Sequence, residues 1–377
     1  MRRPHSAKPW KGSEAIVGHQ RSDTFLGSTG VTPMMKTKPA QPCDGDTPKA
    51  NSRRCFSAED DLTTGAIDNS SARASSEALA GCPKPFPHLR TTSLDFSLDD
   101  WAAEKGQGEN EDRQEAVKRI SAWMVAGDLS AVLDLSFLRL STLPAELPAG
   151  LQRLNVDCNH LAHLPGELPG ELQALNARYN RLTSLPGTLP PGLQILEVSY
   201  NRLISLPDVL PATLQWLGAG GNQLASLPDK LPIALQTINV DSNQLTYVPA
   251  GLPAGLQTLN IDGNRLTSLP DNLPSGLQTL NANGNQLTKL PAKLPAALQT
   301  LGAADNRLTG LPNDLPVGLR RLNARCNLLI SLPDKLFAKL GSGCLVFLES
   351  NPLPKGALTN LVAALHAANY TGPLIFL

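Results

Sequence analysis

Six cysteines are the most reactive side chains in this sequence, and their spacing limits the chemistry they could perform. A CxxC pair would indicate a zinc site or a redox centre. The sequence contains no such pair, and the scattered positions favour unpaired thiols over a disulfide framework or a metal site. We therefore expect no metal and no cofactor to be held by these residues: Cys43, Cys55, Cys82, Cys158, Cys326 and Cys344.

Carboxylates form a second group with possible chemistry. Asp241, Asp262 and Asn283 follow one another at a constant interval, and Asp157 belongs to the same series. Carboxylate and amide oxygens are ligands that Ca²⁺ accepts. Because no ligand-dense loop surrounds these residues, the sequence favours a row of solvated polar side chains, with a cation site at Asp241 and Asp262 as the alternative.

Aromatic residues make up only 4% of the chain, so a local group of them is notable. Tyr179, Tyr200 and Trp216 lie close together in the sequence with an arginine and a glutamate among them. Aromatic and Arg side chains are the usual energetic centre of protein interfaces. We predict that they anchor a protein partner; the alternative is that they only decorate a sheet surface. The predicted binding residues are Arg153, Asp157, Arg178, Tyr179, Ile195, Glu197, Tyr200, Trp216, Arg321 and Arg325.

The element that positions these residues is a short tandem repeat. An asparagine recurs at a fixed interval within a constant frame of leucines, which is typical of leucine-rich-repeat solenoids. We expect its side chain to meet backbone groups inside each turn, and an Asn243→Ala change to cost about 1–3 kcal/mol. The predicted ladder is Asn159, Asn180, Asn201, Asn222, Asn243, Asn264, Asn285, Asn306 and Asn327.

The frame LxxLxVxxNxL also predicts the fold class, an α/β leucine-rich-repeat solenoid. Alternate residues of a short strand point inward, so the second leucine and the following Val, Ile or Ala form the core. Successive strands are then parallel and line a concave face. On the convex side, LPxxLP segments such as Leu269–Pro274 forbid a regular helix and favour extended backbone.

The sequence predicts four parts: the repeats, two regions before them and one region after them. Residues 1–90 lack periodicity, are rich in polar residues, Pro and Gly, and are predicted to be disordered. Residues 91–128 contain amphipathic helical patterns and are predicted to cap the first repeat. The repeats occupy residues 129–354. Residues 355–377 form a C-terminal cap with a helical stripe at Leu358, Leu361, Val362 and Leu365.

Composition excludes some partners. The 33 basic residues equal the 33 acidic ones, so no global charge favours nucleic acid or an anionic membrane. No apolar run approaches the roughly 18 residues of a membrane span, and the start has no secretory apolar region. The segment 1–57 is poor in acids, which suits an unfolded export signal; a solvated tail and an organellar transit peptide are alternatives.

The tandem frame LPxxLPxxLxxLxVxxNxLTxLP resembles the IpaH/YopM/SspH group of bacterial type III secretion effectors. Residues Arg113–Ile120, leading through Leu133–Leu135 into Leu143-Pro144, resemble the helical cap of that group, and Leu348–Leu353 with Tyr370–Pro373 resemble its closing segment. The resemblance covers about residues 110 to 377. It implies a secreted virulence protein that binds a host protein in the host cytoplasm or nucleus. It also implies that residues 1–90 engage the secretion apparatus or a chaperone.

Many members of that group continue into a ubiquitin ligase domain whose nucleophile lies in a Cys-x-Asp motif. None of the six cysteines here has Asp two residues later, and the sequence ends where that domain would begin. We therefore expect no ligase activity in this chain. It either acts by binding alone or is the substrate-recognition half of a ligase whose catalytic part is missing or separately encoded. A receptor ectodomain is a third class, with chance glycosylation sequons at Asn69 and Asn369.

Overall fold

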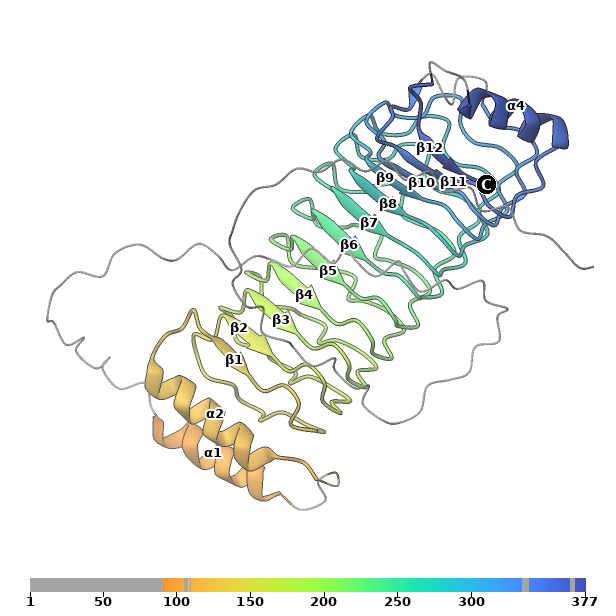
Figure 1. Ribbon diagram of the computed structural model, residues 1–377. Coiled ribbons are helices and arrows are strands. Elements are labelled where there is room, and N and C mark those ends of the chain that lie inside the picture. The colour runs from red at the N-terminus through yellow and green to blue at the C-terminus, as the bar shows by residue number, and fades with distance from the viewer. Residues whose placement is uncertain (1–90, 105–107, 109, 334–338, 367–369) are drawn as a thin grey trace, which may run out of the picture. The chain divides into compact units, whose positions relative to one another are not determined.

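A computed structural model describes residues 91–104, 108, 110–333, 339–366 and 370–377 of the chain. The predicted disorder of residues 1–90 lies outside this part. The repeats form one parallel sheet in which every strand pairs with the next in chain order, as Figure 1 shows. The strands are β1 (Val132–Asp134), β2 (Arg153–Asn155), β3 (Ala174–Asn176), β4 (Ile195–Glu197), β5 (Trp216–Gly218), β6 (Thr237–Asn239), β7 (Thr258–Asn260), β8 (Thr279–Asn281), β9 (Thr300–Gly302), β10 (Arg321–Asn323), β11 (Leu345–Phe347) and β12 (Leu374–Phe376).

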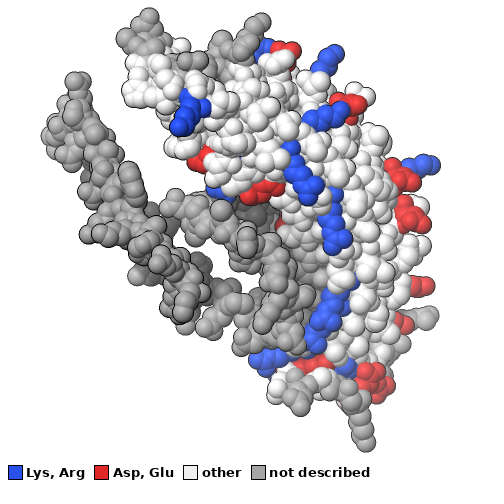
Figure 2. All heavy atoms as spheres, turned by 90° about the vertical axis from the view of Figure 1, so that its right-hand side faces the viewer, with Lys and Arg blue, Asp and Glu red and all other residues white. Residues whose placement is uncertain are grey.

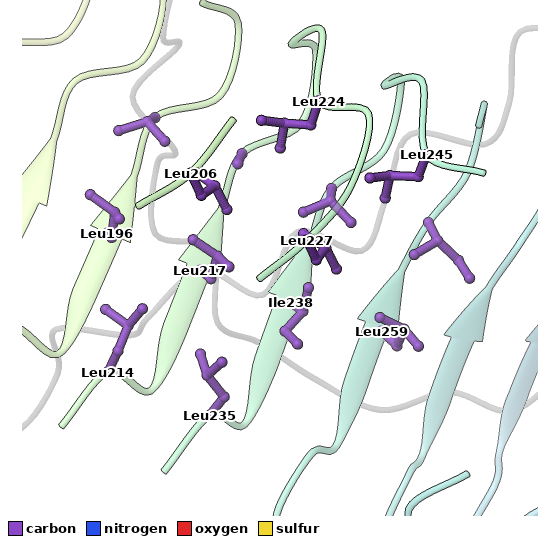
Figure 3. Close-up of a cluster of buried hydrophobic side chains, with 14 of the residues drawn as sticks. Leu196, Leu206, Leu214, Leu217, Leu224, Leu227, Leu235, Ile238, Leu245 and Leu259 are labelled. Atoms are coloured by element: carbon purple, nitrogen blue, oxygen red, sulfur yellow. The ribbon is translucent and has the colours of Figure 1, made fainter. Parts of the chain in front are cut away.

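The core follows the alternation that the sequence predicts. In β7 the middle residue, Leu259, is fully buried, whereas Thr258 and Asn260 on either side are only half-buried. Ile261 then turns inward again and is also fully buried. The leucines of each turn pack against those of the turns before and after it (Figure 3). Each repeat is therefore stabilised by its neighbours, which confirms the predicted solenoid.

The asparagine ladder joins each turn to the one before it. The Asn243 Nδ2 group donates to the carbonyl oxygens of Val240 and Asp241 in its own turn and of Ala219 in the preceding turn, at 2.9–3.1 Å. Its Oδ1 accepts from the backbone N–H of Leu224 at 2.9 Å. In the tight turn, backbone N–H and C=O groups have no partner in the sheet. The buried Asn side chain forms hydrogen bonds with both kinds of group.

Two helices cover the first repeat. Helix α1 spans Thr91–Ala103 and helix α2 spans Arg113–Ala126, where Gly127 in the left-handed region ends it. The buried Arg113 fastens this cap: its guanidinium donates to the Trp101 carbonyl at 2.6 Å and to Thr142 Oγ1 of the first repeat at 2.9 Å. Trp101 and Trp123 are both buried, so they form part of the core of this cap.

The far end is closed by helix α4 (Lys355–Leu365) and by a strand that the sequence does not reveal. Residues 374–376 were assigned to a cap, yet they form β12 and pair in parallel with β11. The sheet therefore continues past the insertion that separates β10 from β11. Among the described residues, no helix combines the length and apolar composition needed to cross a bilayer.

Candidate partner-binding site

The concave face is built from the outward positions of each strand and of the turn that follows it. The register of the sheet brings equivalent residues into rows: Ile195 pairs with Trp216, and Glu197 pairs with Gly218. The turn after each strand contains a residue with positive φ just before the ladder asparagine, such as Tyr179 (49°) and Tyr200 (57°). Because neighbouring turns repeat this backbone, their side chains are held parallel and close together.

Five of the predicted binding residues come together in this way, and we call them the aromatic cluster: Arg178, Tyr179, Glu197, Tyr200 and Trp216. The Tyr179 and Tyr200 rings stack with centroids 4.5 Å apart and planes 3° from parallel. The Arg178 guanidinium lies 5.4 Å from the Tyr179 centroid and 5.9 Å from that of Tyr200, within the range of a cation–π contact. Both tyrosines remain 46% exposed, so part of each side chain is accessible at the surface.

Glu197 connects the two halves of the cluster. Its carboxylate accepts a hydrogen bond from Trp216 Nε1 at 3.1 Å and another from Ser199 Oγ at 2.5 Å. The same carboxylate lies 3.9 Å from Arg178 Nε, which makes an ion pair without a hydrogen bond. The indole, the carboxylate and the guanidinium are thus held in fixed positions before any partner arrives.

Two glycines of the fifth repeat, Gly218 and Gly221, leave the space that the cluster occupies. A Cβ atom at Gly218 would collide with the Glu197 carboxylate. A Cβ atom at Gly221, where φ is +63°, would lie 2.7 Å from Tyr200 Cδ1. The glycines therefore form a notch in the concave face, and side chains from the fourth repeat lie across it.

Next to or within the aromatic cluster, two buried polar atoms have no hydrogen-bond partner in the described part of the chain: Asp157 Oδ1 and Arg178 Nε. Burial raises the pKa of the Asp157 carboxyl above its ordinary value, although the Arg178 guanidinium opposes this shift. Unsatisfied buried polar atoms are uncommon and are costly in free energy. The two atoms therefore carry a local cost in stability beside the aromatic cluster.

The remaining predicted residues lie outside the cluster. Ile195 is half-buried beside Trp216, and Arg153 is exposed at the start of β2. Arg321 lies five strands away from β5, where its guanidinium sits 4.8 Å from the Phe347 ring; Arg325 follows in the same repeat. Phe347 in turn stacks on Phe376 at 4.8 Å.

The Phe347–Phe376 pair was missed by the sequence prediction. One signal was available, because the alternation in Val346-Phe347-Leu348 places Phe347 outward. No local signal could place Phe376 beside it, since that contact depends on β12 joining the sheet. The concave face therefore carries one aromatic group in repeats three to five and another at the far end, within the described part of the chain.

The carboxylates considered as cation ligands are engaged within the protein. Asp262 accepts hydrogen bonds from Asn283 N (2.6 Å) and Asn283 Nδ2 (3.1 Å), so both of its oxygens face donors. Asp241 accepts from Ser242 Oγ at 3.1 Å. Over the described ranges, no three His, Cys, Asp or Glu side chains gather as a metal-ligand set. This arrangement fits a polar row better than a calcium site, which needs six to eight oxygen ligands.

Asp262 leads to a prediction about pH. Burial raises its pKa from 3.8 to about 6, and nearby Asp241 adds to the rise, whereas the Asn283 hydrogen bonds oppose it. A carboxyl with a raised folded-state pKa binds its proton more tightly in the folded protein. We therefore expect the free energy of unfolding to fall as pH increases from about 4 to about 7.

The measurement is urea unfolding at pH 4.5 and 7.5 for the parent protein, Asp262→Asn and Asp271→Asn. Asp271 is exposed and serves as the control. The decline between the two pH values should shrink by about 1–2 kcal/mol in Asp262→Asn only. A larger decline in that variant would contradict the predicted direction.

Cys344 offers no activated thiol. Cys344 is buried, and burial raises the pKa of its thiol to about 11. A thiol with such a pKa is almost entirely protonated at neutral pH and is a poor nucleophile. Cys158 and Cys326 are half-buried in the concave turns of distant repeats, so they cannot form a disulfide with each other.

Comparison with known proteins agrees with this architecture. Residues 255–275 match the Leucine Rich Repeat family. Over 48 residues, 13% of this chain, the sequence is 56% identical to a probable E3 ubiquitin-protein ligase of Sinorhizobium fredii (strain NBRC 101917 / NGR234); the match spans only 9% of that protein. Among solved structures, YopM from Yersinia enterocolitica WA-314 is 32% identical, with a TM-score of 0.47 and coverage of 70% of this chain and 64% of that one. A Shigella effector LRR domain is 28% identical, with a TM-score of 0.37 and coverage of 76% of this chain and 96% of that one.

The chain is therefore a leucine-rich-repeat protein. It resembles the repeat domains of YopM and of a Shigella effector, and it shares a short segment with a probable ubiquitin ligase. It spans about a tenth of that ligase and less than two thirds of YopM. A catalytic domain is not evidenced by these similarities.

Proposed function

We propose that this protein is a secreted bacterial effector that acts as a binding module and binds a host protein through its concave face. The observation that carries the proposal is the aromatic cluster. Its side chains are stacked and hydrogen-bonded to one another but remain partly exposed. Aromatic and Arg side chains fixed in advance lose little conformational freedom on binding, so more of their contact energy appears as affinity.

The effector class is supported by the tandem LPxxLP repeats with their helical cap, which resemble the IpaH/YopM/SspH group. Under this proposal residues 1–90 carry the export signal and engage the secretion apparatus or a chaperone. The site of action is the host cytoplasm or nucleus. Deleting residues 1–90 should abolish translocation into host cells while leaving binding to an isolated partner unchanged. Translocation of the shortened protein would exclude this role for the segment.

The test of the binding site uses the full chain to capture partners from host lysate, and then measures affinity for the isolated partner. Trp216→Ala and Tyr200→Ala should each weaken binding by about 1–3 kcal/mol, because they remove anchors from the centre of the interface. Tyr247→Ala is the matched control: Tyr247 is 47% exposed, like Tyr200, but it lies outside the concave strands. Losses well below about 1 kcal/mol in both cluster variants would end the proposal.

An alternative proposal is that the chain is the substrate-recognition half of an IpaH-type ubiquitin ligase. The segment that is 56% identical to a probable E3 ligase favours it. The two proposals share the binding site and differ in what happens to the bound protein. Ubiquitin transfer to the captured partner, in the presence of activating and conjugating enzymes and the product of an adjoining Cys-x-Asp reading frame, would favour the ligase. Binding without transfer would favour the binding module.

A further inference from the structure

A row of arginines runs along one margin of the solenoid and takes no part in the aromatic cluster. Each of them follows a ladder asparagine, or its equivalent in the first repeat, and all are exposed. None of the ten equivalent positions, from 139 to 328, carries an acidic residue. We call these residues the arginine row: Arg139, Arg181, Arg202, Arg265 and Arg307.

The backbone holds the row rigidly. The N–H of Arg202 donates to the Leu182 carbonyl of the preceding repeat at 2.9 Å, and the N–H of Arg265 donates to the Leu245 carbonyl at the same distance. Parallel strands stack about 4.7–4.9 Å apart, so the row extends over roughly 40 Å. Its charges are thus ordered along a line before a ligand binds.

The guanidinium groups of the row are free within the described part of the chain, where they make no hydrogen bond or ion pair with a carboxylate. Figure 2 shows Lys and Arg side chains in a broken line along the solenoid. His160, which lies between Arg139 and Arg181, has a lowered pKa because it is partly buried and because both arginines repel its proton, although Glu111 opposes the shift. Ion pairs within the described part of the chain therefore do not neutralise the positive charge along this margin.

The row is narrow, because acidic side chains flank it. Asp241 and Asp262 lie on the concave side, and exposed Asp208, Asp229 and Asp271 follow in the convex turns. A broad polyanion, such as duplex DNA or a flat anionic membrane, would bring its phosphates against these carboxylates as well. A single extended chain of carboxylates fits along the row without reaching either flank. Guanidinium groups suit such a ligand because they bind carboxylates bidentately.

We propose that the arginine row is a second interaction surface that binds an extended, Asp- and Glu-rich segment of a partner protein. At about 3.3 Å per residue, a segment of about twelve residues matches the length of the row. The surface steers the partner and aligns its segment along the solenoid. The row runs beside the aromatic cluster, because Tyr179 and Tyr200 stand two residues before Arg181 and Arg202. Steering of this kind weakens as salt screens the charges.

The test measures binding of a fluorescent twelve-residue Asp/Glu peptide to the full-length protein, with an Asn/Gln peptide of equal length for comparison. Only the acidic peptide should bind, and its affinity should fall steeply between 50 and 300 mM salt. The triple variant Arg181→Gln, Arg202→Gln, Arg265→Gln should bind it at least tenfold more weakly. The control Lys230→Gln, Lys293→Gln changes two exposed convex lysines and should bind within twofold of the parent.

Equal binding by the parent and the triple variant would overturn the proposal, because the peptide would then be held elsewhere, for example by the basic segment 1–57. Tighter binding of 24-base-pair DNA or of phosphatidylserine vesicles, lost in the triple variant, would also overturn it. Trp216→Ala should leave peptide binding unchanged. The arginine row and the aromatic cluster are thus tested by separate variants.

Discussion

Asn243→Ala should lower the free energy of unfolding by about 2–5 kcal/mol, as measured by urea denaturation. The asparagine is buried and makes four hydrogen bonds, three as donor to carbonyls and one as acceptor from Leu224 N–H. Alanine leaves the Leu224 N–H without a partner inside the coil. The expected loss of unfolding free energy exceeds the value of about 1–3 kcal/mol expected from the sequence, because the Asn243 side chain bonds to two repeats rather than one.

The matched control is Gln244→Ala, one residue further along the same turn. It leaves the ladder intact and should change stability by less than about 0.5 kcal/mol. Hydrogen exchange provides an independent measurement, because coupling in a solenoid passes between neighbours. Faster exchange in Asn243→Ala should be concentrated in residues 219–245. If Asn243→Ala were as stable as Gln244→Ala, the ladder would not be the source of turn stability.

Gly221→Val should destabilise the protein by about 2–4 kcal/mol and disrupt the aromatic cluster. Gly221 has φ of +63°, where a β-branched residue is strained. Its new Cβ would also meet the Tyr200 ring at 2.7 Å, so Tyr200 must move away from Tyr179. The collision matters for function, because it displaces Tyr200 although no residue of the aromatic cluster has been substituted.

Gly263→Val is the control that separates these two causes. Gly263 has nearly the same φ, +60°, but its Cβ would find its nearest neighbour at an ordinary 3.5 Å, in Ser242. Both variants therefore carry the backbone strain, and only Gly221→Val carries the collision. We expect Gly221→Val to be less stable by at least about 1 kcal/mol, and to lose partner affinity. Equal stability and equal affinity would mean that Tyr200 is free to move and is not a fixed anchor.

The sequence could place the predicted binding residues on one face, but it could not give their contacts. Outward positions follow from the alternation along each strand, so Tyr179, Tyr200 and Trp216 could be placed on one face. Their contacts could not be derived, because stacking at 4.5 Å depends on side-chain conformations in two neighbouring turns. The role of Gly218 and Gly221 was hidden as well, since a missing side chain is informative only once its neighbours are known.

The sequence by itself determined the solenoid, its ladder and the core of each repeat, because these depend on a pattern that recurs in every repeat and between adjacent turns. Only the tertiary structure decided which exposed side chains meet. The bridge from Glu197 to Trp216 and the pairing of Phe376 with Phe347 both arise from groups on different turns. Their geometry is set by packing between repeats, and no local pattern encodes it.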